Sequence, residues 1–156
     1  MFDNLFLYFF LAAVIFAILS GIFFALQKKN TITNYKQLDS VELKNINGTI
    51  ISDNGPLKKN FQWCSFDILI NKNSVFIFPR NFYFIPTRLI NLIYSNSDKK
   101  YTRRPLILRE LKIAANSVEI IYYHRYEIMG KRKINLKNLN EQQVSIFENI
   151  RKNKNY

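Results

Sequence analysis

The sequence predicts one transmembrane helix followed by a small, mainly β domain of the α+β class that ends in a helix. Three observations support this fold class. The segment from Leu5 to Leu26 holds 22 residues without a charge. Hydrophobic residues then recur with a period of two from Trp63 onward, which is typical of half-buried strands. The segment 141–152 instead carries hydrophobic residues at helical spacing.

The apolar segment is long enough to cross a bilayer. At 1.5 Å per residue it forms a helix of about 33 Å, against a hydrocarbon core of roughly 30 Å. Tyr8 near its start is typical of an interfacial anchor. A cleaved signal peptide is the alternative, but such signals open with positive residues and end in a small-residue cleavage site. Because both are missing here, we expect an uncleaved signal anchor.

The charges on either side of the span predict its orientation. Asp3 lies in the short N-terminal segment 1–4, whereas Lys28 and Lys29 follow the span directly. The positive-inside rule places residues 1–4 outside the cell membrane and the C-terminal domain in the cytoplasm. From Asn30 onward the chain has 21 Lys and Arg against 10 Asp and Glu, a net charge of 21 − 10 = +11. This basic domain indicates the same orientation.

Small residues are spaced four apart within the span, at Ala13, Ala17 and Gly21. This spacing allows two helices to approach closely, so these residues are a candidate homodimer face. Small residues are common in membrane spans, and the alternative is that they have no partner.

After a juxtamembrane linker, 27–39, the domain 40–156 begins with a hairpin signature. The predicted strands Trp63–Ile70 and Ser74–Phe78 are separated by the turn residues 71–73. Pro79 and Pro86 restrict Phe82–Ile85 to a short or edge strand. The apolar run Leu89–Tyr94 follows, and the charged stretch 96–104 predicts a long loop.

A second set of strands precedes the last helix. These are Leu106–Ala114, Ser117–Tyr126 and Lys133–Leu139, with a turn predicted at 129–131. Asn140 is a candidate N-cap for a helix that reaches residue 152, with acidic residues in its first turn. About six or seven short strands and one closing helix predict an antiparallel barrel or bent sandwich whose open side the helix covers.

This order of elements resembles the pleckstrin-homology-like (PH-like) superfold, specifically its small membrane-anchored bacterial members. The resemblance rests on FDILINKNSVFIF, SVEIIYYHRYEIMGKRKINL and NEQQVSIFENIRK. Members of the superfold mostly bind lipid headgroups, peptides or partner proteins. The resemblance therefore implies a binding module without catalytic activity. The basic early loop of phosphoinositide-binding members is not matched, because the loop 71–73 holds a single lysine.

The residue types needed for catalysis or metal binding are sparse. His124 is the only histidine and Cys64 the only cysteine, so neither a zinc site nor a disulfide within the chain is expected. We interpret both as structural residues; a Cys64–His124 nucleophilic pair is the alternative. The glycines are isolated, which argues against a phosphate-binding loop. We expect no enzyme, no cofactor and no metal.

Clustered basic residues are the main functional signal. They are candidates for contact with anionic lipid on the inner leaflet, which attracts each such group by about 1 kcal/mol. The alternative is a solvated surface. The candidates are Lys28, Lys29, Lys99, Lys100, Arg103, Arg104, Lys131, Arg132 and Lys133.

The anchor, the basic domain and the missing catalytic pattern together predict a function. We expect a cytoplasmic binding or scaffolding module that recruits a protein partner at the membrane. An anionic-lipid sensor and an accessory subunit of a membrane complex are the alternatives. Nucleic-acid binding is less expected, because no predicted helix carries a stripe of basic residues along one face.

Overall fold

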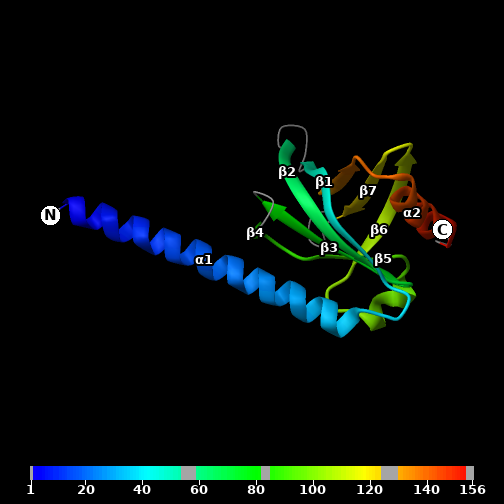
Figure 1. Ribbon diagram of the computed structural model, residues 1–156, viewed down its shortest axis with the longest axis horizontal. Coiled ribbons are helices and arrows are strands. Elements are labelled where there is room, and N and C mark those ends of the chain that lie inside the picture. Colours follow the sequence, from blue (N-terminus) through cyan, green and yellow to red (C-terminus); the bar gives the residue numbers. More distant parts are fainter. Residues whose placement is uncertain (1, 54–58, 82–84, 124–129, 154–156) are drawn as a thin grey trace.

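In the computed structural model a long N-terminal helix leads into a β-barrel, and a second helix follows (Figure 1). The structure describes residues 2–53, 59–81, 85–123 and 130–153. The first helix, α1, spans Phe2–Tyr35, and the second, α2, spans Glu141–Asn153. The predicted α+β class is thus confirmed at the level of an apolar N-terminal helix, a barrel and a C-terminal helix.

In the described part of the chain, seven strands close the barrel in the order β2-β1-β8-β7-β6-β5-β3, and β3 pairs again with β2. A two-residue strand, β4, pairs with the end of β3. The strands are β1 (Val41–Asp53), β2 (Lys59–Ile70), β3 (Ser74–Asn81), β4 (Ile85–Pro86), β5 (Ile90–Ile93), β6 (Leu106–Ala114), β7 (Ser117–Tyr123) and β8 (Lys131–Lys137).

The barrel is mixed, which corrects the prediction of a wholly antiparallel one. β5 and β6 pair in parallel, Leu92 with Leu106. The chain returns between them through a short 3₁₀ helix, η1 (Asn96–Tyr101), where the sequence pattern indicated only a loop. Ser95 and Asp98 form a capping box that stabilises η1, because the backbone N–H of Ser95 donates to the Asp98 carboxylate at 3.0 Å.

Several strands differ from the sequence pattern. β2 begins at Lys59 rather than Trp63, and β8 spans Lys131–Lys137 rather than Lys133–Leu139. β1 has no counterpart in the predicted strands, because a bulge between Leu43 and Ile46 shifts its alternation of apolar residues. Asn45 lies in this bulge with a φ of 58°, a conformation that Asn tolerates better than most residues. β3 continues through Pro79 to Asn81, beyond the predicted end at Phe78. His124 and the predicted strand and turn residues 125–129 lie outside the described residues.

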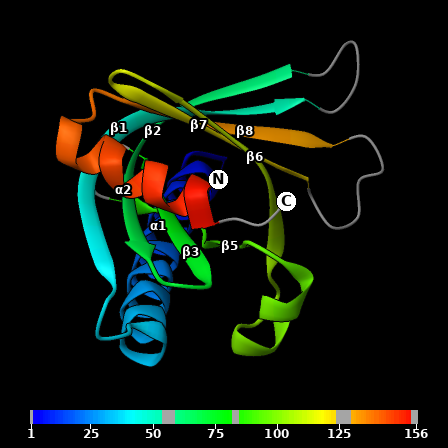
Figure 2. The ribbon, with the colours of Figure 1, turned by 90° about the vertical axis from the view of Figure 1, so that its right-hand side faces the viewer.

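The predicted capping of the C-terminal helix is confirmed. The Asn140 side chain accepts a hydrogen bond from the backbone of Gln143 at 2.8 Å, and the Gln143 side chain accepts one from the Asn140 backbone at 3.0 Å. The apolar face of α2, formed by Val144, Phe147 and Ile150, is buried in the main core. As Figure 2 shows, α2 thereby lies across one end of the barrel.

The barrel has two ends that matter for function. At the α2 end, Val41 pairs with Ile70 and Ala114 with Ser117. At the opposite end, named the Lys59 end below, Asp53 pairs with Lys59 and Tyr123 with Lys131. Figure 1 shows that the N-terminal half of α1 extends away from the barrel, on the side opposite α2.

Candidate binding surfaces

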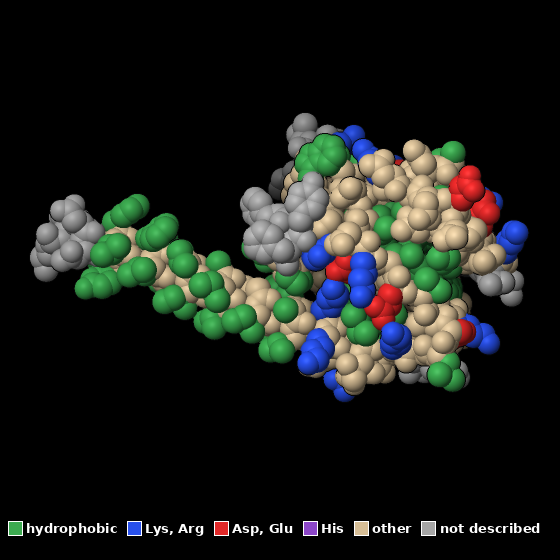
Figure 3. Space-filling model, in the orientation of Figure 1, with side chains coloured by type: hydrophobic (Ala, Val, Ile, Leu, Met, Phe, Trp, Pro, Cys, Tyr) green, Lys and Arg blue, Asp and Glu red, His purple; other side chains and the backbone are tan. Residues whose placement is uncertain are grey.

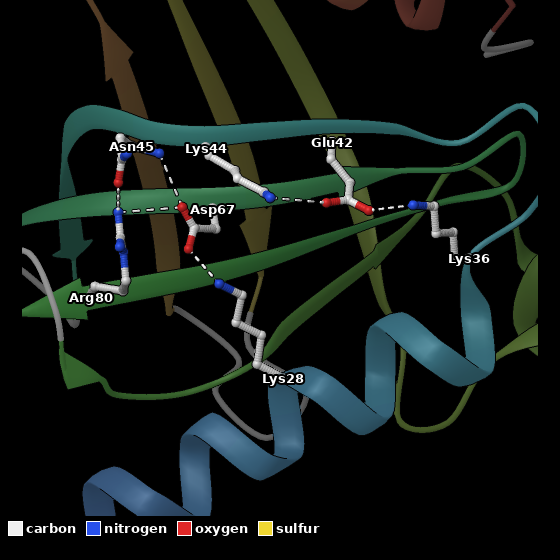
Figure 4. A network of polar contacts seen from close by, with 7 residues as sticks. All are labelled: Lys28, Lys36, Glu42, Lys44, Asn45, Asp67 and Arg80. Carbon is white, nitrogen blue, oxygen red and sulfur yellow. Dashed lines mark hydrogen bonds and ion pairs between the residues drawn. The ribbon is translucent and has the colours of Figure 1, made fainter.

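A polar network joins α1 to the outside of the barrel (Figure 4). The ammonium group of Lys28 lies 2.5 Å from the carboxylate of Asp67 on β2. It also lies 5.8 Å from the centre of the Phe78 ring. Further along, Lys36 lies 2.7 Å from Glu42 on β1. These contacts connect the end of the apolar helix to the first two strands.

Asp67 has three polar partners, although its side chain is only 8% exposed. Besides Lys28, its carboxylate accepts a hydrogen bond from the backbone N–H of Asn45 at 3.0 Å and lies 3.3 Å from Arg80. Burial of Asp67 opposes its ionisation, but the bonds from Lys28 and Asn45 and the two positive charges outweigh that effect and lower its pKa. Arg80 in turn donates to the side chain of Asn45, which places the bulge of β1 in the same network.

Apolar contacts complete the junction. A second, small core on the outer face of the sheet consists of Leu69, Phe76 and Phe78, and Ile32 and Tyr35 of α1 pack against it. The rings of Tyr35 and Phe76 are stacked with their centres 5.0 Å apart. The barrel also holds the end of the helix, because the Asn71 side chain donates to the backbone carbonyl of Tyr35 at 2.7 Å. The last three turns of α1 are therefore part of the domain.

The junction changes the expected connection between helix and domain. The segment 27–39 was predicted as a polar juxtamembrane linker, but α1 remains helical as far as Tyr35. In the described residues, α1 is the one helix long and apolar enough to cross a membrane, and a signal sequence shares those features. Figure 3 shows hydrophobic side chains all along the free part of α1, with Lys and Arg where it meets the barrel.

The candidate dimer face of α1 coincides with the face that docks on the barrel. With 3.6 residues per turn, Ala13, Ala17 and Gly21 are in line with Lys28 and Tyr35. Ala13 and Ala17 are exposed and Gly21 is half-buried. A second helix packing on this face would thus meet the barrel at its C-terminal end.

The structure separates the predicted lipid-facing basic residues into three groups. Lys28 is engaged by Asp67, and Lys29 next to it is exposed. Lys131, Arg132 and Lys133 begin β8 at the Lys59 end. Lys99, Arg103 and Arg104 are exposed in or after η1, which adjoins the α2 end; Lys100 belongs to η1, but its side chain lies outside the described residues. Lys28, Lys29 and the basic residues of β8 lie on the side of the barrel from which the apolar part of α1 extends. The basic residues in and after η1 do not.

A cleft of about 750 Å³ opens at the α2 end, where α2, η1 and the turn between β2 and β3 meet. Its apolar side chains are Val41, Ile70, Ile146 and Ile150, of which Ile70 and Ile150 are buried. Its polar residues are Asp39, Asn71, Lys72, Asn73, Tyr94, Ser95, Asp98 and Asn149. An apolar floor with a polar rim is the usual composition of a binding site. Sequence reasoning missed this cleft, because its residues come from four separate segments.

Tyr94 helps to shape this cleft. Its hydroxyl donates to the backbone carbonyl of Asn71 at 3.2 Å, which connects the β2–β3 turn to η1. Burial raises the pKa of Tyr94, and the nearby charge of Asp98 raises it further. The phenol is therefore neutral at physiological pH and acts as a hydrogen-bond donor.

A second groove, of about 570 Å³, lies beside Trp63 on β2. It is lined by Asn47, Gly48, Gln62, Trp63, Cys64, Ser65, Arg80, Asn81, Lys137 and Asn138. The Ser65 hydroxyl and Nε of Arg80 are buried, and neither has a hydrogen-bond partner in the described residues. Lys137 lies 5.4 Å from the centre of the Trp63 ring.

The interior of the barrel becomes polar toward the Lys59 end. There Gln62 donates to Asn81 at 2.7 Å, and Arg88 lies 3.5 Å from Gln62. Burial raises the pKa of Tyr122, against the opposing charges of Arg88 and Arg132. Burial likewise raises the pKa of the Cys64 thiol, opposed by Arg88, so the unreactive thiol form is favoured.

The fold and these surfaces define a β-barrel of the α+β class with an apolar N-terminal helix docked on it. Comparison with known proteins finds no family model and no curated protein that matches the chain. Among the described residues no group of three His, Cys, Asp or Glu side chains is placed to hold a metal ion. Any functional assignment therefore depends on the surfaces themselves.

Proposed function

We propose that this protein is a membrane-anchored, non-catalytic binding module that receives a protein partner in the cleft at the α2 end. The observation that carries the proposal is the docking of α1 on the barrel. The junction holds the barrel in one orientation, with the α2 end away from the apolar part of the helix (Figure 1). The cleft opens at this α2 end. A partner bound there would meet the protein from the aqueous side.

The junction also supports an uncleaved anchor over a cleaved signal. After the apolar segment, Lys28 and Tyr35 contact the barrel, and Thr31 between them is only 6% exposed. Removing the apolar segment would interrupt the helix next to these contacts. The proposed orientation, with the N-terminus outside and the barrel in the cytoplasm of an inner cell membrane, follows from Asp3, Lys28 and Lys29.

A PH-like barrel is the finer fold assignment that we propose. A barrel closed by a C-terminal helix with a buried apolar face supports it. The parallel pairing of β5 with β6 is a departure from the antiparallel pattern expected for it. Members of that superfold mostly bind lipid headgroups, peptides or proteins, which agrees with a binding role.

Orientation can be measured with single-cysteine variants. In a Cys64→Ser background, Ser97→Cys places a thiol on exposed η1. We expect a membrane-impermeant thiol reagent to label it only after the cells are opened. Labelling of intact cells would contradict the proposed cytoplasmic location.

The cleft can be tested by photo-crosslinking from α2 in the full-length protein. A photoreactive residue at Asn149, on the cleft rim, should give a defined adduct, whereas the same residue at the exposed Gln142 outside the cleft should not. Ile146→Gln in the cleft floor should abolish the Asn149 adduct while the thermal unfolding curve shows a folded protein. Equal adducts from both positions, or an adduct that survives Ile146→Gln, would refute the cleft as the binding site.

Direct contact with anionic lipid is the second candidate function. The observation that favours it is the position of Lys131 and Lys133 at the Lys59 end, on the side where α1 emerges. The Arg132 side chain between them faces the barrel interior beside Tyr122. Flotation of the full-length protein cannot test it, because the anchor binds any bilayer. A test needs a spectroscopic probe on the barrel itself, and Trp63 on β2, the only tryptophan of the chain, provides one.

A further inference from the structure

Two large aromatic side chains are exposed on the outer face of the barrel. Phe61 and Trp63 on β2 are 51% and 70% exposed, and their rings meet edge to face with centres 5.1 Å apart. Trp63 is the most exposed aromatic residue of the barrel in the described part of the chain. Leaving this much apolar surface in water is unfavourable, so an environment that covers it is expected.

The docking of α1 determines which surface this aromatic pair faces. Tyr35 of α1 lies beside Asn71 at the α2 end of β2, and Lys28 lies beside Asp67, closer to the middle of that strand. Toward its N-terminus the helix therefore runs in the direction of the Lys59 end, where it also contacts β4. Its exposed apolar part continues beyond that end (Figure 1). A membrane crossed by α1 would lie against the end of β2 that carries Phe61 and Trp63.

The chemistry around the pair matches a lipid surface. Tryptophan prefers the interface between water and hydrocarbon, where its ring is buried and its N–H stays hydrated. Lysines flank the pair, and their charges complement anionic headgroups. Lys137 lies over the Trp63 ring, and Lys59 precedes Phe61 on β2. Lys133 on β8 pairs with Ile51 on β1, and Ile51 in turn pairs with Phe61.

The groove beside Trp63 supplies donors for a headgroup. Ser65 is only 2% exposed, and its hydroxyl has no hydrogen-bond partner among the described residues. Nε of Arg80 is likewise buried without a hydrogen-bond partner among the described residues, although Nη2 of the same side chain contacts Asp67 and Asn45. Ser65, Arg80 and Lys137 all line this groove, so their donors are the groups that would bind an entering phosphate.

We propose that the Phe61–Trp63 edge inserts into the interfacial layer of the membrane that α1 crosses, and that the adjacent groove binds the headgroup of an anionic lipid. This inference rests on the proposed membrane anchor. It adds a second contact between the domain and the bilayer, made by the barrel and independent of the helix.

Trp63 is the only tryptophan of the chain, so its fluorescence reports on this edge alone. The full-length protein is reconstituted in nanodiscs whose lipids carry bromine, a quencher, near the headgroup or deep in the acyl chain. We expect strong quenching of Trp63 by the shallow bromines and weak quenching by the deep ones. No quenching by either lipid would overturn the proposal.

Two relocated tryptophans serve as controls in a Trp63→Phe background. Phe10→Trp lies in the apolar helix and should be quenched by the deep bromines. Lys72→Trp lies in the turn at the α2 end and should not be quenched. If Phe10→Trp is not quenched, the membrane anchor itself fails; if it is quenched while Trp63 is not, only the present inference fails.

The headgroup site has its own test. Lys137→Gln should reduce the quenching of Trp63 in nanodiscs that contain phosphatidylglycerol and leave it unchanged in pure phosphatidylcholine. Lys112→Gln, an exposed lysine of β6, should change neither. An equal effect of the two substitutions, or no effect of Lys137→Gln, would refute the headgroup site.

Discussion

Asp67 is the residue on which the junction between helix and barrel is centred. Its carboxylate brings together Lys28 from α1, Asn45 from the bulge of β1 and Arg80 from β3. A carboxylate removed from water is stable only when it is paired and hydrogen-bonded, and these groups supply both. The buried Asp67 carboxylate thus holds the apolar helix in a fixed position relative to three strands.

Neutralising Asp67 should weaken this junction in a pH-dependent way. Because the folded pKa lies below the ordinary value of 3.8, the ionised carboxylate stabilises the protein fully above 3.8, and this contribution is lost as the pH falls through the folded pKa. We expect Asp67→Asn to cost about 1–3 kcal/mol at neutral pH. Thermal unfolding in detergent at several pH values should show the two proteins converging at strongly acidic pH. A constant difference at all pH values would contradict this account.

Gly48 on β1 is required by close packing rather than by backbone conformation. A Cβ at this position would lie 2.0 Å from the backbone oxygen of Asn135 and 2.9 Å from the Phe66 ring, whereas a Cβ at Gly21 in α1 would meet nothing within 4 Å. We expect Gly48→Ala to destabilise the barrel by about 1–3 kcal/mol or more, since 1–3 kcal/mol is the usual cost of overpacking a core. Gly21→Ala is the matched control and should not lower the unfolding temperature. Similar unfolding temperatures for both variants would refute the packing explanation.

At the scale of elements, α1 and α2 cover different parts of the same barrel. α2 places Val144, Phe147 and Ile150 against the main core. The last turns of α1 cover the second core on the outer face of β2 and β3, formed by Leu69, Phe76 and Phe78. β2 is therefore buried on both faces over its second half, which explains why its apolar alternation ends in the continuous run Ile68–Ile70.

The start of α2 should depend on its capping residue. Asn140→Ala removes the side-chain bond to the Gln143 backbone and should cost about 0.5–2 kcal/mol. Gln142→Ala, at an exposed position of the first turn, should cost much less. Chemical denaturation of the two variants measures the difference. Equal stability of the two would show that the cap contributes nothing.

At the scale of the whole molecule, the barrel is not complete without the end of α1. The second core has Ile32, Tyr35 and Leu89 as its only partly buried apolar neighbours among the described residues, and two of the three come from the helix. A domain boundary drawn at the end of the apolar segment would fall within this structural unit. The anchor and the domain are therefore expected to unfold together.

Two fragments can test this dependence. A fragment beginning at Gln27 keeps the docking turns of α1, and one beginning at Val41 removes them. We expect the shorter fragment to be less stable and to aggregate, because Leu69, Phe76 and Phe78 become exposed. Light scattering and thermal unfolding compare the two. A shorter fragment that is as stable and as monomeric as the longer one would show that α1 is dispensable for the barrel.

Local sequence pattern is enough to predict several features of this protein. The uncharged run Leu5–Leu26 predicted the long apolar helix, the alternation around Phe66 and Ile68 predicted the β2–β3 hairpin, and Asn140 predicted the start of α2. Each of these features is specified by residues that are close together in the chain. Their periodicity or capping chemistry is therefore visible without the fold.

The way in which these elements pack together is visible only in the folded protein. The position of Lys28 after the span makes it a candidate for lipid contact, but its partner Asp67 is 39 residues away and is not predictable from local pattern. The same holds for the bulged strand β1, the parallel pairing of β5 with β6, and the cleft at the α2 end. These features arise from contacts between distant segments, and a one-dimensional pattern of hydrophobic and charged residues does not specify which segments will touch.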